Sequence, residues 1–332
     1  MKKYSIIVPV YNRPDEMEDL LESLAVQTVH NFELLVVEDG SSVPCKEVCD
    51  AYAEKFPITY FFKSNSGPGD SRNFGMGKAK GEYLLFFDSD CVIPPDYFEK
   101  VEAHLQKRPL DAYGGPDSAD ESFTDVQKAI NYAMTSIFTT GGVRGKENKL
   151  DQFQPRSFNM GVRKEVYERV GGFGDIHPGE DPDWSYRIMN AGFRVGLIPE
   201  AFVYHKRRID FSKFIKQVYK FGVVRVILMK WFPDKTKLTY FFPTAFLLGS
   251  VGLLLLGGLV SKLFWLPFTF LKILLFVDAF RLNKSLKIAV LAVLASFIQL
   301  YAYGWGFLKS FWRIKVLRIE ERKAFPGFFF KK

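Results

Sequence analysis

The sequence predicts an α/β body, with a mostly parallel sheet covered by helices on both faces, followed by apolar membrane helices. Strand-like and helix-like segments alternate over the first 110 residues, which is typical of β-α units and a parallel sheet. Residues 32–38 and 83–88 are continuous apolar runs, as in strands buried on both faces. After residue 205 the composition changes to long uncharged runs separated by basic residues.

The elements of the body follow in the order that such a sheet requires. β-branched, aromatic and other apolar residues indicate strands at residues 5–10, 32–38, 58–63 and 83–88. The spacing of apolar residues indicates helices at residues 14–27, 44–56, 69–80 and 96–106. We expect irregular loops over residues 111–157, order again over 158–173, and a helix over about 182–191. Because ligands of such sheets bind beyond the carboxyl ends of the strands, the site is expected there.

The net charge of +8 is an average over two unlike parts. Residues 1–205 carry 22 Lys and Arg against 32 Asp and Glu, a net of −10, and the remaining residues carry 23 against 5, a net of +18. An acidic body beside a basic, apolar tail predicts a domain held at an anionic membrane surface. No basic run interleaved with aromatic residues lies within the body, so nucleic acid is not an expected partner.

Three apolar runs follow a segment, residues 211–230, in which apolar residues are interleaved with Lys and Arg as in an interfacial helix. Residues 238–261 and 288–308 contain no charge and are long enough to cross a bilayer. Residues 263–280 are apolar but interrupted by Lys272 and Asp278. We therefore expect two or three spanning helices, and the side of the membrane on which the tail ends stays open.

The expected organisation has four parts. These are a catalytic domain (1–210), an interfacial amphipathic segment (211–237), a membrane region (238–312) and a basic C-terminal tail (313–332). The N-terminal sequence lacks the apolar core of a signal peptide, and the basic cluster before the first run favours a cytoplasmic body. The expected location is a bacterial-type inner (cell) membrane, crossed more than once.

Missing patterns argue against several common classes. The three cysteines, Cys45, Cys49 and Cys91, are an odd number in a large chain and do not indicate a disulfide framework or a zinc site. The sequence contains no GxxxxGK[ST], GxSxG or HExxH pattern. A P-loop NTPase, a triad hydrolase and a zinc protease are therefore disfavoured.

Acidic residues gather at the predicted ligand edge of the sheet. Asp39 follows one buried strand, Asp88-Ser89-Asp90 follows another, and Glu180-Asp181-Pro182-Asp183 opens a helix. Carboxylates this close together repel one another unless a cation or donor groups satisfy them. Two carboxylates at i and i+2 suit a hard cation that a diphosphate also holds, although an isolated Asp-Ser-Asp is more often a solvated turn.

The motifs in series resemble family 2 glycosyltransferases with a GT-A fold. The resemblance covers residues 4–205 and rests on five elements: VPVYN, VVEDGS, SGPGDSRNFGMGKAKGEYLLFFDSD, NMGVRKEVYERVGGF and EDPDWSYRIMNAGFRVGLIPEAFVYH. The tail is similar to that of bacterial members that serve cell-surface polysaccharide assembly. Processive members carry QxxRW, but this chain has Gln217-Val-Tyr-Lys220-Phe221 instead, so a single-addition enzyme is expected.

The resemblance implies roles for individual residues. Pro9 and Tyr11 would line the nucleotide base, Asp39 would accept a hydrogen bond from it, and Arg72 would lie near the base or the diphosphate. Donor contacts would also come from Asp88 and Ser89, and metal ligands from Asp90 and His205. Asp181 would be the general base, with Glu180, Asp183 and Trp184 on the acceptor side.

Simpler interpretations of three of these residues stay open. Asp181 could cap the following helix, with Pro182 as its first residue. His205 could be a surface histidine, because basic residues follow it. The ring of Trp184 could belong to the core.

The function expected is inverting transfer of a sugar from a nucleotide diphosphate donor, with UDP favoured, to a lipid-linked or glycan hydroxyl, with Mn²⁺ or Mg²⁺. One base and no carboxylate nucleophile imply direct displacement, and the metal and Arg72 would stabilise the leaving group. The alternatives are a polyprenyl-phosphate glycosyltransferase and a non-catalytic nucleotide-sugar-binding subunit.

Overall fold

A computed structural model of the chain describes residues 3–118, 123–140, 153–205 and 210–330. The chain divides into two compact units. Unit 1 comprises residues 1–120, 147–206 and 327–332, and unit 2 comprises residues 121–146 and 207–326.

Unit 1 contains a seven-stranded sheet in the order β3-β2-β1-β4-β8-β6-β9. Its strands are β1 (Tyr4–Val10), β2 (Phe32–Asp39), β3 (Ile58–Lys63), β4 (Tyr83–Phe87), β6 (Ala112–Gly114), β8 (Asn159–Arg163) and β9 (Val195–Leu197). Strand β8 is antiparallel to its neighbours β4 and β6, and every other pairing is parallel. The mostly parallel sheet expected from the sequence is thus confirmed. A three-stranded sheet combines β5 (Cys91–Val92), β10 (Val203–His205) and β7 (Asp117–Ser118).

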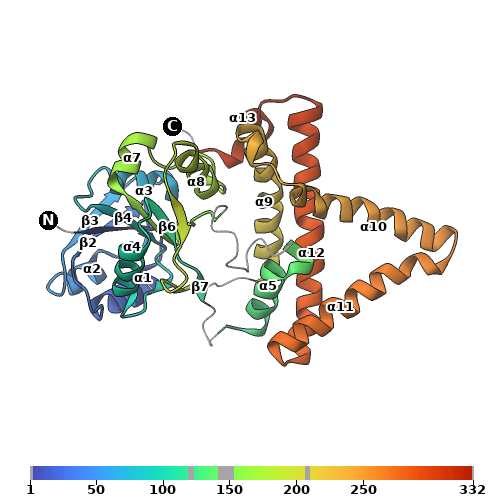
Figure 1. Ribbon diagram of the computed structural model, residues 1–332, viewed down its shortest axis with the longest axis horizontal. Coiled ribbons are helices and arrows are strands. Elements are labelled where there is room, and N and C mark those ends of the chain that lie inside the picture. The colour runs from blue at the N-terminus through green and yellow to red at the C-terminus, as the bar shows by residue number, and fades with distance from the viewer. Residues whose placement is uncertain (1–2, 119–122, 141–152, 206–209, 331–332) are drawn as a thin grey trace. The chain divides into compact units, whose positions relative to one another are not determined.

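Helices cover both faces of the large sheet (Figure 1). The strands alternate their apolar side chains between the faces, so that Ile6 and Val8 belong to one core and Ile7 to the other. One face is covered by α1 (Pro14–Ala25), α2 (Lys46–Tyr52) and α4 (Tyr97–Lys107). The opposite face is covered by α3 (Pro68–Met76), α7 (Lys164–Val170) and α8 (Glu180–Asn190).

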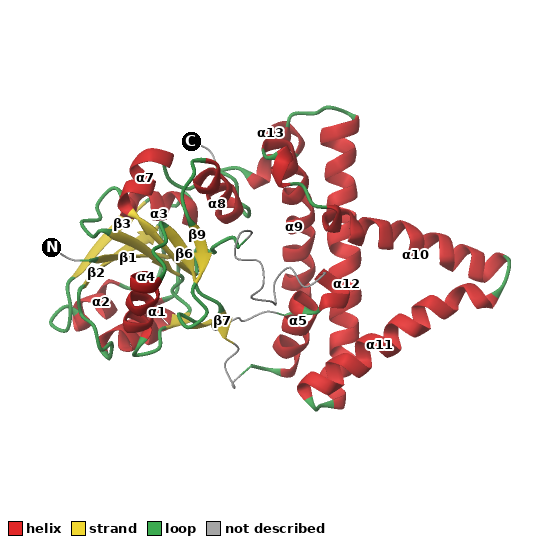
Figure 2. Cartoon of the chain, in the orientation of Figure 1, coloured by secondary structure: helices red, strands yellow, loops and turns green. Residues whose placement is uncertain are grey.

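Unit 2 is helical (Figure 2). Its α-helices are α5 (Asp125–Thr135), α6 (Ile137–Thr140), α9 (Phe211–Trp231), α10 (Phe242–Leu259), α11 (Leu266–Asn283), α12 (Leu286–Phe311) and α13 (Glu321–Ala324). Helix α12 packs along α9 and α5, whereas α10 and α11 extend from this group and meet at a short turn. Three segments are long and apolar enough to cross a membrane: Leu238–Leu259, Lys262–Asn283 and Leu286–Val316.

The expectation of irregular loops over residues 111–157 was wrong in part. Strands β6 and β7 and helices α5 and α6 lie within this range. Helix α5 begins with a capping box, in which the Thr124 hydroxyl accepts from the Gln127 N–H and the Gln127 side chain accepts from the Thr124 N–H. Its apolar side is buried in unit 2, where Ala129 and Tyr132 belong to one apolar cluster with Ala289. The sequence did not indicate this helix, because its apolar partners in α9, α11 and α12 lie far away in the sequence.

Candidate active site

The predicted site residues meet at one edge of the sheet. Strands β1, β2 and β4 are parallel neighbours, so their carboxyl ends lie side by side. Tyr11 follows β1, Asp39 ends β2, and Asp88 follows β4. The tertiary structure therefore gathers the three motifs at the edge where a parallel sheet binds its ligands.

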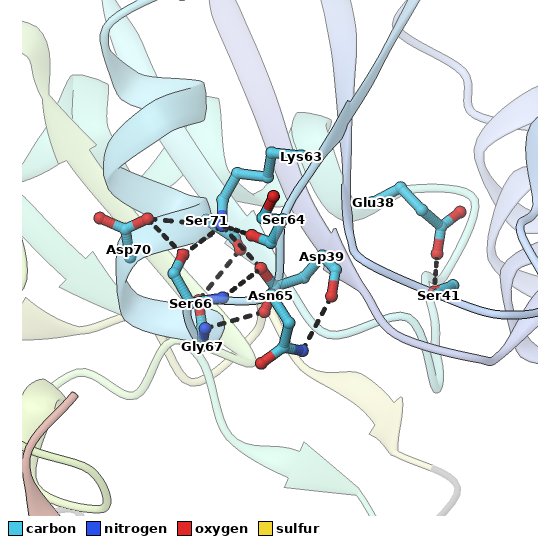
Figure 3. A network of polar contacts seen from close by, with 10 residues as sticks. All are labelled: Glu38, Asp39, Ser41, Lys63, Ser64, Asn65, Ser66, Gly67, Asp70 and Ser71. Carbon is cyan, nitrogen blue, oxygen red and sulfur yellow. Dashed lines mark hydrogen bonds and ion pairs between the residues drawn. The ribbon is translucent and has the colours of Figure 1, made fainter. Parts of the chain in front are cut away.

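Asp39 is 4% exposed and holds the loop after β3 (Figure 3). Its Oδ1 accepts from Lys63 Nζ at 2.6 Å and from the Ser66 N–H at 2.9 Å, and its Oδ2 accepts from the Gly67 N–H at 2.9 Å. Gly67 has φ +96°, a backbone conformation that favours glycine. Three of the bonds that Asp39 can accept are thus used within the protein, and a nucleotide base would use a remaining lone pair.

Asn12 and Glu38 order the loop that follows β2. Asn12, with φ 54°, accepts from the N–H groups of Ser42 and Val43 at 2.8 and 3.0 Å. Glu38 is fully buried and accepts from the Ser41 hydroxyl and from the Cys45 N–H. Both side chains are satisfied by the protein, which indicates that they shape the loop beside the site.

Arg72 connects helix α3 to the end of β4. Its Nη2 donates to Asp88 Oδ1 at 2.6 Å, and its guanidinium lies 5.6 Å from the ring centre of Phe173. The side chain is 4% exposed, yet Nε and Nη1 have no hydrogen-bond partner among the described residues. Buried donors of a guanidinium are costly to leave unpaired. Two such donors beside Asp88 therefore fit an anionic ligand.

Asp90, the second carboxylate of the Asp88-Ser89-Asp90 motif, lies near Arg13. Arg13 Nη1 is 3.7 Å from Asp90 Oδ2 and 2.5 Å from Glu16 Oε2. Among the described residues, no group of three His, Cys, Asp or Glu side chains is arranged to hold a metal. Two carboxylates completed by ligand phosphates would nevertheless fit Mg²⁺, which is often held that way in phosphate-binding sites.

Asp181 lies in the first turn of α8 and is the carboxyl group with the clearest perturbation. Burial, and secondly the charge of Glu180, raise the pKa of Asp181 to about 6. Its Oδ1 is buried and has no hydrogen-bond partner in the described part of the chain. The N-cap of α8 is Gly179, with no side-chain cap bond, so the capping interpretation of Asp181 was wrong.

Glu180 is paired with a residue that the sequence analysis did not identify. Its Oε1 lies 2.9 Å from Nδ1 of His177. Burial opposes ionisation of Glu180, but the hydrogen bond and charge of His177, together with the charge of Arg72 and a backbone hydrogen bond, hold the pKa of Glu180 below its ordinary value. Glu180 therefore keeps its negative charge beside Asp181, which helps to raise the pKa of Asp181.

Two of the residues expected on the acceptor side are buried and have their partners within the protein. Trp184 is completely buried between Phe86 and Phe173, and its Nε1 donates to the Gly171 carbonyl at 2.7 Å. Asp183 is 6% exposed and pairs with Arg187 at 2.8 Å. Trp184 therefore offers no surface to an acceptor, which corrects the expectation, because its indole completes the core under α8.

The remaining predicted residues differ in position and exposure. Tyr11 is 53% exposed, as a side chain that contacts a ligand would be, whereas Pro9 lies within β1 and Ser89 is buried. The backbone of His205 pairs with Cys91 in the small sheet, but its side chain lies outside the described residues. Its role as a metal ligand stays a prediction.

Sequence reasoning missed Lys63, Arg13 and His177. Each is a basic residue next to a predicted acidic one in space: Lys63 beside Asp39, Arg13 beside Asp90, and His177 beside Glu180. The only signal in the sequence was position, because Lys63 ends a strand, Arg13 follows VPVYN, and His177 lies three residues before Glu180.

A family model matches half of the chain, and the similar proteins are described as glycosyltransferases. The profile described as "Glycosyl transferase family 2" matches residues 5–171. An "Uncharacterized glycosyltransferase" of Haemophilus influenzae is 42% identical over 194 residues, 56% of this chain and 61% of that protein. A protein of the same description from Rickettsia felis is 39% identical over 104 residues, 31% of this chain. The matched segment spans only 17% of that relative.

A solved structure has the same fold. The mannosyltransferase PcManGT of Pyrobaculum calidifontis, in complex with GDP-Man and Mn²⁺, has a TM-score of 0.64. The alignment covers 89% of this chain and 87% of PcManGT, with 16% sequence identity. At this identity the likeness concerns the fold.

Proposed function

The chain belongs to glycosyl transferase family 2, and we propose that it moves a sugar from a nucleotide diphosphate sugar to a hydroxyl of a lipid-linked or cell-surface glycan. The protein is a glycosyltransferase that acts on nucleotide sugars; the favoured donor is a UDP-sugar, and the transfer is a single addition. The observation that carries the proposal is the pair of unpartnered donors on Arg72, on the same sheet edge as the perturbed Asp181.

Arg72 supplies positive charge to the leaving group. Breaking the bond between the sugar and the diphosphate develops negative charge on the departing phosphate oxygen. A buried guanidinium, of which the two nitrogen atoms Nε and Nη1 have no partner among the described residues, stabilises that charge in the transition state. Asp88 fixes the orientation of the guanidinium through its 2.6 Å bond, so the donors are aimed before the ligand arrives.

A divalent cation fits the same place. Asp88 and Asp90 would supply two carboxylates to the cation, and the phosphates of the donor would supply further oxygen ligands. PcManGT was solved with Mn²⁺, which supports this assignment. When bound, the cation neutralises charge on the diphosphate. The side chain of Arg13 lies 3.7 Å from Asp90 and balances part of the acidic charge there.

Asp181 is the general base. The acceptor hydroxyl must lose a proton as it attacks the anomeric carbon, and a carboxylate with a pKa of about 6 is ionised at neutral pH yet basic enough to accept it. Its unpartnered Oδ1 is the atom that takes the proton. With one base and no nucleophilic carboxylate, transfer proceeds by direct displacement and inverts the anomeric configuration.

The membrane placement that fits this function is a hairpin of α10 and α11, with the catalytic unit on the cytoplasmic side. Residues 327–330 pair with unit 1, so the chain crosses the membrane an even number of times between residues 206 and 327. Only 17% and 11% of the residues in the spans of α10 and α11 are buried in the protein, against 44% for α12. The first two therefore face lipid.

The test is a donor screen on membranes that contain the full-length protein. Wild type should transfer label from one nucleotide sugar, and a chelator should abolish transfer until Mn²⁺ or Mg²⁺ is restored. Asp50→Asn should transfer label as wild type does, because this carboxylate lies exposed on α2 and pairs only with Lys46 in the described structure. Absence of turnover with every donor, with and without cation, would overturn the proposal.

A further inference from the structure

Residues 327–330 return to unit 1 and pair with the loop before α8. Ile176 and Phe329 form an antiparallel bridge. The His177 N–H donates to the Phe328 carbonyl at 2.8 Å, and the Phe330 N–H donates to the Asp175 carbonyl at 3.0 Å. This backbone pairing joins segments about 150 residues apart in the sequence, so it closes a long loop of the chain, which carries an entropic cost.

Phe330 contacts the two loops from which the site helices begin. Its ring centre lies 5.7 Å from that of His177. Its ring also covers Gly67, because a Cβ atom at position 67 would lie only 2.2 Å from Cζ of Phe330. Gly67 precedes α3, and His177 precedes α8. A single side chain therefore lies against both loops.

Each contact of Phe330 leads to a residue of the site. Gly67 donates its N–H to Asp39 (Figure 3). Gly67 is also the N-cap of α3, the helix that contains Arg72. His177 bonds Glu180, the neighbour of Asp181. Movement of either loop would change the direction of Arg72 or the surroundings of Asp181.

We propose that Phe330 is a positioning residue for the transfer reaction. Its ring fixes the Gly67 and His177 loops relative to each other, and so holds the guanidinium of Arg72 and the carboxylate of Asp181 in reacting geometry. The proposal rests on the function proposed above. It adds to that function a requirement for a segment that lies outside residues 5–171, the range matched by the family profile.

The first test compares Phe330→Ala and Phe330→Leu in the full-length protein in detergent or nanodiscs. We expect Phe330→Ala to lower kcat about 10- to 100-fold, since small misplacements of reacting groups have effects of this size. Phe330→Leu keeps apolar volume over Gly67 and should recover most of kcat. Phe62→Ala is the matched control, because Phe62 is an exposed phenylalanine on β3.

A double-mutant cycle tests the contact itself. Gly67→Ala should lower kcat, because the new methyl group clashes with the Phe330 ring and the φ of +96° strains an alanine. Phe330→Ala in the same chain removes the clash, so the combined loss should be smaller than the product of the single losses. Thermal unfolding of each variant shows whether the chain still folds.

The outcomes separate this proposal from the function on which it depends. No turnover by wild type with any donor would reject the function. An active wild type together with a kcat of Phe330→Ala within twofold of it would reject the positioning role. A fall in melting temperature with unchanged kcat would also reject it, because that result describes a structural contact only.

Discussion

Arg72 donates to Asp88 at 2.6 Å while two of its other nitrogen donors, Nε and Nη1, have no hydrogen-bond partner among the described residues. The bond to Asp88 therefore fixes the orientation of this buried guanidinium, while the hydrogens on Nε and Nη1 stay available to a ligand. The cost of leaving the donors unpaired is about 1–3 kcal/mol for each group, and an anionic ligand would recover it. Under the proposed function, this ligand is the diphosphate of the sugar donor.

Arg72→Lys should weaken donor use more than a loss of charge alone would, because an ammonium cannot reproduce the planar set of donors. We expect kcat/KM for the donor to fall about 100-fold, with a rise in the dissociation constant of the nucleotide diphosphate measured by calorimetry. Arg194→Lys is a control, since Arg194 is exposed and pairs with Asp111. Arg194 precedes β9, which pairs with β6 and is separated by it from the strands of the site. Equal nucleotide affinity in Arg72→Lys and wild type would contradict the assignment.

The activity should depend on pH through Asp181. Because burial raises the pKa of this group to about 6, the base is ionised above pH 6 and protonated below it. The rate kcat should therefore be full near pH 7.5 and fall about tenfold for each pH unit below 6. A profile that stays flat down to pH 4.5 would show that another group, or none, accepts the proton.

Asp181→Asn should separate catalysis from stability. The folded state binds the proton of Asp181 more tightly than the unfolded chain does, so this group stabilises the fold when protonated, below about pH 4, and loses that contribution as the pH rises through 6. An uncharged asparagine should raise the free energy of unfolding at pH 7.5 by about 1–3 kcal/mol, measured by chemical denaturation. The same change should lower kcat by a factor of about 100 to 10,000.

Near-normal activity of Asp181→Asn would favour the polyprenyl-phosphate alternative. A phosphate acceptor is already ionised and needs no strong base. Glu168→Gln is a suitable control for both measurements, because Glu168 is exposed on α7.

Cysteine labelling can determine how often the chain crosses the membrane. The three native cysteines are buried, so single cysteines introduced at exposed positions should dominate labelling by an impermeant maleimide. A cysteine at Lys262, between α10 and α11, should react from outside intact cells, whereas cysteines at Lys284 and Gly327 should react only after lysis. External labelling at Gly327 would show an odd number of crossings and reject the hairpin.

Several elements were predictable because their signals are local. The runs at residues 32–38 and 83–88 are strands, and Asp39 and Asp88 do end or follow them at one sheet edge. The apolar segments of the tail form the helices expected there, including the interrupted one with Lys272 and Asp278. Helix α5 was not predictable in the same way, because its apolar residues have partners only in unit 2.

By itself the sequence determined the family, the sheet and the residue types at its ligand edge, because short-range periodicity and motif spacing encode them. The tertiary structure decided which carboxyl groups have a shifted pKa and which side chains are buried in the core. The pKa of Asp181 follows from desolvation, Trp184 is enclosed by core side chains, and Phe330 is carried to Gly67 by pairing across the chain. Burial and long-range pairing depend on neighbours distant in sequence, so no local pattern contains them.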